Sequence, residues 1–226
     1  MASSIHRKSP PEEEAHSRTQ FQVDRIAFFS DAVIAIAITL LVLEIKIPPL
    51  GKDSTWREII ATFDTKLFPS FVSLFLCFFT IGVLWMRHHE LFEHINRYNK
   101  GLIKINLYFL LTVVLLPVSI SFTQQPDNPG YLRPLVFTLN LFACNLTYYL
   151  MLLHVFHKKN RFSTLQSKSV IQRMQRHALT GTLVFFSMSL LSLLHTTWFF
   201  IPILVFPMVS ILRRIQARLK SPAAAT

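Results

Sequence analysis

Apolar residues occur along the chain in long blocks that short polar segments separate. A helix needs about 20 mostly apolar residues to cross a hydrocarbon core of roughly 30 Å. Blocks of that length begin near Ala27, Phe68, Leu102 and Leu135, and a longer block begins near Ala178. The pattern therefore predicts an all-α polytopic membrane protein.

The boundaries of these blocks predict spans at residues 27–47, 68–86, 102–122 and 135–156, with two more inside 178–212. The last block, taken as one straight helix, would be about 52 Å long and would exceed a bilayer core. We divide it near His195, which gives six transmembrane helices. The expected organisation is a cytosolic N-terminal tail over 1–24, a transmembrane domain over 25–214 and a cytosolic C-terminal tail over 215–226.

Composition and charge agree with this topology. The chain is 51% hydrophobic and 15% charged, whereas soluble domains carry roughly 25% charged residues. With six spans, most of the 23 Lys and Arg residues fall on the side that holds both termini, which the positive-inside rule assigns to the cytoplasm. The exceptions are Lys46, Lys52, Arg57, Lys66 and Arg133.

The net charge of +11 does not indicate a nucleic-acid partner. The cationic residues form short clusters between apolar runs rather than one continuous stripe. Anionic lipid headgroups are a better match for clusters at the membrane surface. Cys77 and Cys144 lie inside apolar runs, without the spacing of a metal site, and no cofactor is expected.

A dense polar cluster follows the second predicted span and includes His88, His89, Glu90, Glu93 and His94. The spacing of its His and Glu residues makes a zinc site one interpretation. A polar cluster is also expected where a span ends, and a Glu stands where a zinc-protease motif needs its second His. We therefore predict no metal site.

The first span carries an ionisable residue, Asp31, about one turn from its start. A carboxylate inside a membrane is costly unless it has a partner or water. Asp31 can simply favour a helix N-terminus through the macrodipole. Alternatively, it belongs to a buried polar network at the cytosolic end, with Arg25, Ser30 and His88 as candidate partners. The residues alone leave both interpretations open.

The same span carries an apolar stripe, because Ile36, Leu40 and Leu43 follow an i, i+4, i+7 spacing. Thr39 lies beside this stripe. In an ordinary span such a stripe faces lipid or packs against another helix. Helical periodicity does not distinguish these surfaces from the wall of a pore.

Two motifs resemble the transmembrane protein 175 family of potassium channels. The first is the Arg-x-x-x-Phe-Ser-Asp pattern at residues 25–31, which opens the first span. The second comprises Trp-Met-Arg-His at 85–88, Leu-Phe at 91–92, Asn-Leu at 106–107 and Leu-Pro at 116–117. The resemblance covers about residues 25–122.

This resemblance implies a six-span subunit of a homotetramer in which the first helices line the pore. It implies apolar rings at Ile36, Leu40 and Leu43, a polar ring at Thr39, and no carbonyl selectivity filter. The permeant ion would be K+, and the partners would be further copies of the chain, membrane lipids and monovalent cations. The implied polar network supports the pore helix and comprises Arg25, Phe29, Ser30, Asp31, Trp85, His88 and Asn106.

We expect such a channel in a bacterial inner membrane, with both termini in the cytoplasm. A secondary transporter or proton-coupled carrier is the alternative, although that class usually shows internal repeats with ionisable residues near the midplane. Neither feature is evident here. The sequence also lacks a catalytic motif, so an enzyme is not expected.

Overall fold

Helices form nearly all of the chain that the computed structural model describes, namely residues 10–45, 49, 51, 54–125, 127–157, 162, 163, 165 and 167–194. Within these residues the only β pairing is an isolated bridge between Ile95 and Ser163. The all-α prediction is confirmed. The elements are α1 (Pro10–Leu40), η1 (Leu41–Glu44), α2 (Trp56–Thr62), η2 (Phe63–Leu67), α3 (Phe68–Glu93), α4 (Lys100–Val114), α5 (Leu116–Thr123), α6 (Leu132–Val155) and α7 (Lys168–Leu194).

Five helical segments of the described chain are long and apolar enough to cross a membrane. They correspond to the first five predicted spans. The sixth predicted span, the division near His195 and the C-terminal tail lie outside the described residues. The five segments are Thr19–Glu44, Trp56–Glu93, Lys100–Thr123, Leu132–Val155 and Lys168–Leu194.

The first two spans belong to longer helices than their apolar runs indicate. Helix α1 begins at Pro10, so its backbone passes through much of the predicted N-terminal tail. The second span belongs to a continuous helical segment that begins with α2 at Trp56 and passes through the π-helical turn η2 into α3. A capping box begins this segment, because the Thr55 side chain accepts from the Glu58 N–H while the Glu58 side chain accepts from the Thr55 N–H.

The third span is divided at Leu115 into α4 and α5. Pro117 explains the division, because proline has no N–H to bond the preceding turn and its ring crowds that turn's carbonyl. Backbone bonds from Leu115 to Leu111 and from Ser119 to Leu115 hold the two sides together. The two helices therefore still form one membrane crossing.

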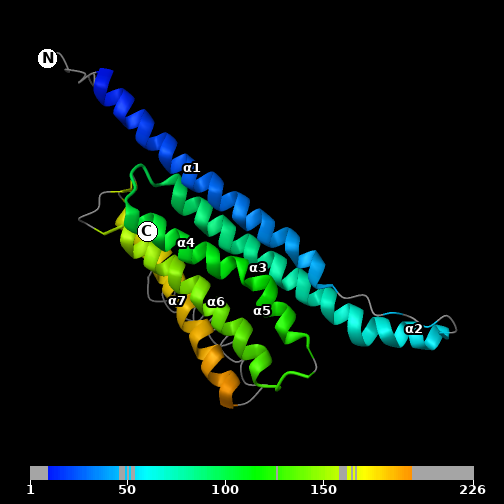
Figure 1. The fold of residues 1–226 in the computed structure, drawn as a ribbon. Coiled ribbons are helices and arrows are strands. Elements are labelled where there is room, and N and C mark those ends of the chain that lie inside the picture. The colour runs from blue at the N-terminus through cyan, green and yellow to red at the C-terminus, as the bar shows by residue number, and fades with distance from the viewer. Residues whose placement is uncertain are drawn as a thin grey trace, which may run out of the picture.

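The helices are arranged so that α1 and the α6–α7 pair lie on opposite sides of the molecule (Figure 1). Helix α1 packs on α3 and α4, while α4 and α5 connect this group to α6. Helices α6 and α7 form the most extensive helix pair. Among the side chains that the structure describes, this packing buries one stripe of α1 and η1, which comprises Val23, Ser30, Ile34, Ala37 and Leu41.

Candidate functional site

A chain of buried polar side chains joins α1, α3 and α4. The Ser30 hydroxyl donates to the Ile26 carbonyl at 2.8 Å, and Asn106 Nδ2 donates to Ser30 Oγ at 2.9 Å. Asn106 Oδ1 lies 2.8 Å from His88 Nε2. An amide oxygen only accepts, so Nε2 is the protonated nitrogen in this arrangement. We call Ser30, His88 and Asn106 the polar cluster, and all three are buried.

Aromatic rings fix the orientation of His88. Its ring stacks on Phe92 with a centroid distance of 4.4 Å and on Phe109 at 5.3 Å. Phe109 is itself fully buried, so this part of the cluster is embedded in the core. The ring faces of His88 are therefore covered by apolar neighbours, while its edge is used for the bond to Asn106.

A second polar contact links α1 to α3 next to the polar cluster. Trp85 Nε1 donates to Asp31 Oδ1 at 2.8 Å. Asp31 thus bonds to Trp85, a member of the network that the resemblance implies, rather than to the candidate partners Arg25, Ser30 or His88. Within the described residues Arg25 is exposed and makes no hydrogen bond or salt bridge, and Phe29 is 52% exposed. The structure therefore does not bring these two side chains into the network.

The apolar stripe of α1 faces away from the rest of the chain. Ile36, Leu40 and Leu43 are 58%, 40% and 71% exposed, respectively. Thr39 is also exposed, and its hydroxyl donates to the Ile36 carbonyl at 2.8 Å. The helix tightens into the 3₁₀ segment η1 after Leu40, which brings residues three apart, such as Leu40 and Leu43, almost into line.

Burial and exposure thus divide α1 and the following η1 into two faces. Ile34, Ala37 and Leu41 are buried against the subunit, while Ile36 and Leu43 are uncovered. The polar cluster and the Asp31–Trp85 bond lie toward the N-terminal part of the span, before this division. These contacts fix the rotation of α1 and therefore determine which side chains it presents outward.

The histidine cluster after the second span does not converge on one point. His88 bonds to Asn106 and lies in the core, whereas His89 stacks on Trp85 at 5.5 Å. His89 Nε2 is 3.3 Å from a Glu93 carboxylate oxygen, on the exposed side of α3. Among the described side chains, no group of three or more His, Cys, Asp or Glu is arranged to hold a metal ion.

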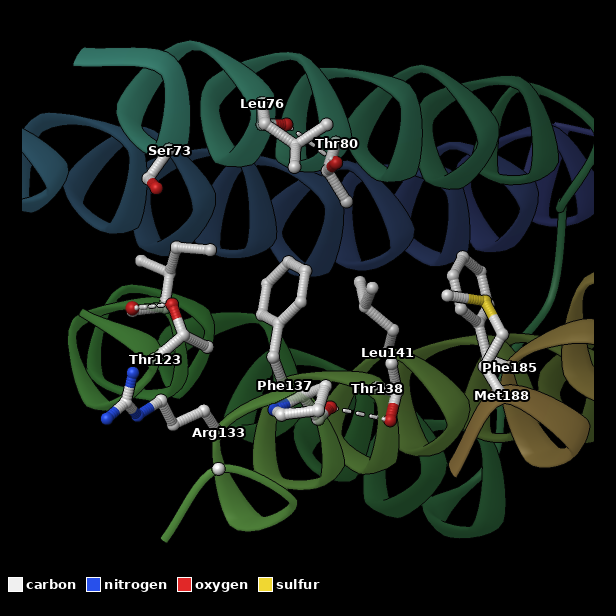
Figure 2. Close-up of a pocket in the computed structure, with 13 residues that line it drawn as sticks. Ser73, Leu76, Thr80, Thr123, Arg133, Phe137, Thr138, Leu141, Phe185 and Met188 are labelled. Carbon is white, nitrogen blue, oxygen red and sulfur yellow. Dashed lines mark hydrogen bonds between the residues drawn. The ribbon is translucent and has the colours of Figure 1, made fainter. Parts of the chain in front are cut away.

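A cavity of about 430 Å³ lies on the other side of α3, between α3, α5, α6 and α7 (Figure 2). Leu76 and Thr80 of α3 face Phe137 and Leu141 of α6 across it. The Thr80 and Thr138 hydroxyls in its wall donate to carbonyls of their own helices. No residue of α1 lines this cavity, so it is separate from the outward face of α1.

Comparisons with known proteins agree with the motifs. The sequence model described as "Endosomal/lysosomal potassium channel TMEM175" matches residues 25–117. A potassium channel of Streptomyces collinus is 30% identical over 135 residues, which are 58% of this chain and 63% of the relative. The endosomal/lysosomal proton channel TMEM175 of Bos taurus is 34% identical over 136 residues, which are 53% of this chain and 28% of that protein.

The chain resembles the TMEM175 family over residues 25–117. It covers less than two thirds of the length of either curated relative. A crystal structure of a TMEM175 homologue from Chamaesiphon minutus, described as a lysosomal potassium-selective channel, superposes with a TM-score of 0.67 at 23% identity. That match covers 86% of this chain and 98% of the other, so the two share a fold. The chain is an integral membrane protein, and its relatives are ion channels rather than enzymes.

Several contacts between the helices of this chain were not apparent from the sequence. Tyr148 donates its hydroxyl to the Arg87 carbonyl at 3.0 Å, and Arg87 Nη1 lies 3.4 Å from Asn145 Oδ1. These bonds connect α3 to α6 across more than fifty residues of sequence. Phe92 has a local signal, since it follows His88 by one helical turn, but Phe109 is placed by tertiary packing alone.

Proposed function

We propose that this chain is one subunit of a potassium-preferring cation channel in which α1 lines the conduit. The observation that carries the proposal is the outward stripe on a helix whose rotation is fixed from behind by hydrogen bonds. The names of the bacterial relatives and the TMEM175 match support a channel, and nothing in them favours a carrier.

The conduit requires further copies of the chain, because one face of one helix cannot enclose an aqueous path. A homotetramer, in which four α1 helices surround an axis, is the assembly that the family resemblance implies. In that arrangement Ile36, Leu40 and Leu43 form successive apolar rings and Thr39 forms a polar ring. The uncovered state of these side chains in the single subunit is compatible with such a role.

Ion selection in this channel depends on hydration. A ring of Ile36 side chains offers no oxygen ligands to replace the water around an ion, unlike a carbonyl filter. K+ releases water at lower cost than Na+, so a narrow apolar ring favours K+ modestly. The same ring can close the path by dewetting. Thr39 uses its donor within α1, which leaves its oxygen lone pairs as the acceptors available to a passing cation.

The nature of the permeant ion is part of the proposal. The Streptomyces collinus relative is named a potassium channel, whereas the Bos taurus relative is named a proton channel. Bi-ionic current measurements with K+, Na+ and a pH gradient separate these alternatives. We expect a reversal potential that follows the K+ gradient.

The distribution of Lys and Arg supports an orientation with both termini in the cytoplasm. A bacterial plasma membrane is the proposed location. Protease digestion of sealed inside-out and right-side-out vesicles that carry the full chain tests this orientation. Cleavage near the N-terminus only in inside-out vesicles is the expected result.

The test of the pore assignment is cation flux into liposomes that contain purified wild-type protein or Ile36→Asn. A ring of Asn side chains offers amide oxygens that can replace water around either K+ or Na+. We therefore expect faster flux and a lower K+ to Na+ ratio. Leu190→Asn on α7, where the side chain is 55% exposed, is the matched control and should leave both unchanged. Unchanged flux and selectivity in a folded, assembled Ile36→Asn protein would contradict the assignment.

A further inference from the structure

A second cavity, of about 180 Å³, lies between α3, α6 and α7 at the membrane face where α3 ends and α7 begins. Its lining includes Arg87 and Glu90 of α3, Tyr148 of α6, and Arg173 and His177 of α7. We call it the cationic pocket. It shares no residue with the outward stripe of α1 or with the polar cluster.

The charges of the cationic pocket do not balance. Two guanidinium groups line it, together with an imidazole and a single carboxylate, that of Glu90. Among the described residues Glu90 forms no salt bridge with Arg87 or Arg173. A concave site with surplus positive charge is complementary to an anion, and paired guanidinium groups are particularly suited to phosphate.

Contacts between α3 and α6 hold Arg87 in place. Its guanidinium contacts Asn145 Oδ1 at 3.4 Å, and its carbonyl accepts from the Tyr148 hydroxyl at 3.0 Å. Asn145 in turn lies against Gly181 of α7, where an added Cβ would be only 2.6 Å from Asn145 Oδ1. The absence of a side chain at Gly181 therefore permits the packing that holds one wall of the pocket.

The position of the pocket relative to the membrane indicates the source of the anion. Arg87 lies less than two turns before the end of α3, and Arg173 lies in the second turn of α7. Both cations are thus close to the end of a membrane-crossing helix, at the level of lipid headgroups. Basic pockets between transmembrane helices at this level recognise phosphorylated headgroups.

We propose that the cationic pocket binds the phosphate of an anionic phospholipid from the adjacent leaflet. The headgroup bridges α3 and α7, which otherwise have little direct contact in the described structure. Because α3 also carries His88 and Trp85, a bound lipid braces the helix that supports α1. The site would thereby link lipid composition to the stability of the subunit.

Native mass spectrometry of the purified full chain tests this proposal. The probes are palmitoyl-oleoyl phosphatidylglycerol and, for comparison, the phosphatidylcholine with the same acyl chains. Arg173→Gln is the test variant, since Arg173 is exposed and makes no hydrogen bond within the described structure. Arg97→Gln is the control, because Arg97 is an exposed arginine at the same membrane face but outside the pocket.

We expect wild type and Arg97→Gln to retain phosphatidylglycerol in preference to phosphatidylcholine, and Arg173→Gln to bind it about fivefold more weakly. Arg173→Lys should recover part of the loss. An equal loss in the two glutamine variants would show non-specific attraction and overturn the proposal. Displacement of the bound phosphatidylglycerol by inorganic phosphate at the same concentration would identify a soluble anion instead and would also overturn the proposal.

Discussion

The α1–α3–α4 region and the α6–α7 pair are held together by different physical means. Three helices meet in the first region through directional bonds, from Asn106 to Ser30, from His88 to Asn106 and from Trp85 to Asp31. Between α6 and α7 the described structure has one such side-chain bond, from Ser189 Oγ to Thr138 Oγ1 at 3.1 Å. The rest of that contact includes Gly181 against the Asn145 side chain and the ring of Phe142 against that of Phe186.

The two regions differ in whether the rotation of a helix about its axis must be fixed. Small residues permit close packing in lipid but do not fix the rotation of a helix by themselves. Hydrogen bonds between buried side chains do, because one rotated helix leaves every partner unsatisfied. The region with directional bonds is the one whose helix presents the outward stripe. The α6–α7 pair serves as a scaffold on the far side (Figure 1).

Asn106→Leu should have the largest effect on the α1–α3–α4 region. The substitution removes both bonds of Asn106 and leaves the Ser30 hydroxyl and the His88 ring edge without that partner in the core. We expect a loss of about 2–3 kcal/mol in the free energy of unfolding, together with loss of cation flux. Thermal unfolding in detergent and flux in liposomes measure the two effects.

Asn140→Leu is the matched control for that experiment. Asn140 on α6 makes one bond, from Nδ2 to Ser119 Oγ at 3.1 Å, and it is only half-buried. We expect a smaller loss of stability and normal flux per assembled protein. If both substitutions reduced flux equally, the distinction between the two regions would fail.

In the α6–α7 pair, the corresponding substitution is Gly181→Ala. The new Cβ would lie within 2.6 Å of Asn145 Oδ1, so Asn145 or the α7 backbone must move. Overpacking of this kind costs about 1–2 kcal/mol. We expect lower thermal stability but an unchanged K+ to Na+ ratio, since the rotation of α1 does not depend on this contact.

Gly82→Ala provides the reference for the Gly181 experiment. A Cβ built at Gly82 meets nothing within 4 Å among the described atoms. Alanine is also the better helix former, so stability should be unchanged or slightly raised. A loss at Gly82 equal to that at Gly181 would mean that crowding against Asn145 is not the cause.

Much of the fold could be predicted because a membrane constrains it strongly. Apolar block length alone located the five described spans, since each must cross the same hydrocarbon thickness. The start of α1 at Pro10 could not be obtained this way, because the polar segment that precedes the span has no apolar periodicity to mark it. The division at Leu115 had a local signal in Pro117, but length favoured one span.

The candidate site was predictable only where sequence motifs marked it. The resemblance grouped Ser30, His88 and Asn106, which the structure brings into hydrogen-bond distance. The residues alone offered Arg25, Ser30 and His88 as partners of Asp31, whereas the structure pairs Asp31 with Trp85, which only the resemblance had grouped with it. The cationic pocket needed the structure, because its residues come from three helices that are far apart in the sequence.

A thiol at Ile36 tests whether the outward stripe of α1 faces water between subunits. The measurement is modification of Ile36→Cys by a water-soluble cationic thiol reagent in the assembled, reconstituted protein, with flux recorded at the same time. Native Cys77 and Cys144 are buried, and Leu190→Cys, at an exposed position of α7, is the control. We expect rapid modification and block of flux for Ile36→Cys alone. Modification of Ile36→Cys only by a lipid-soluble reagent, with flux unaffected, would contradict it.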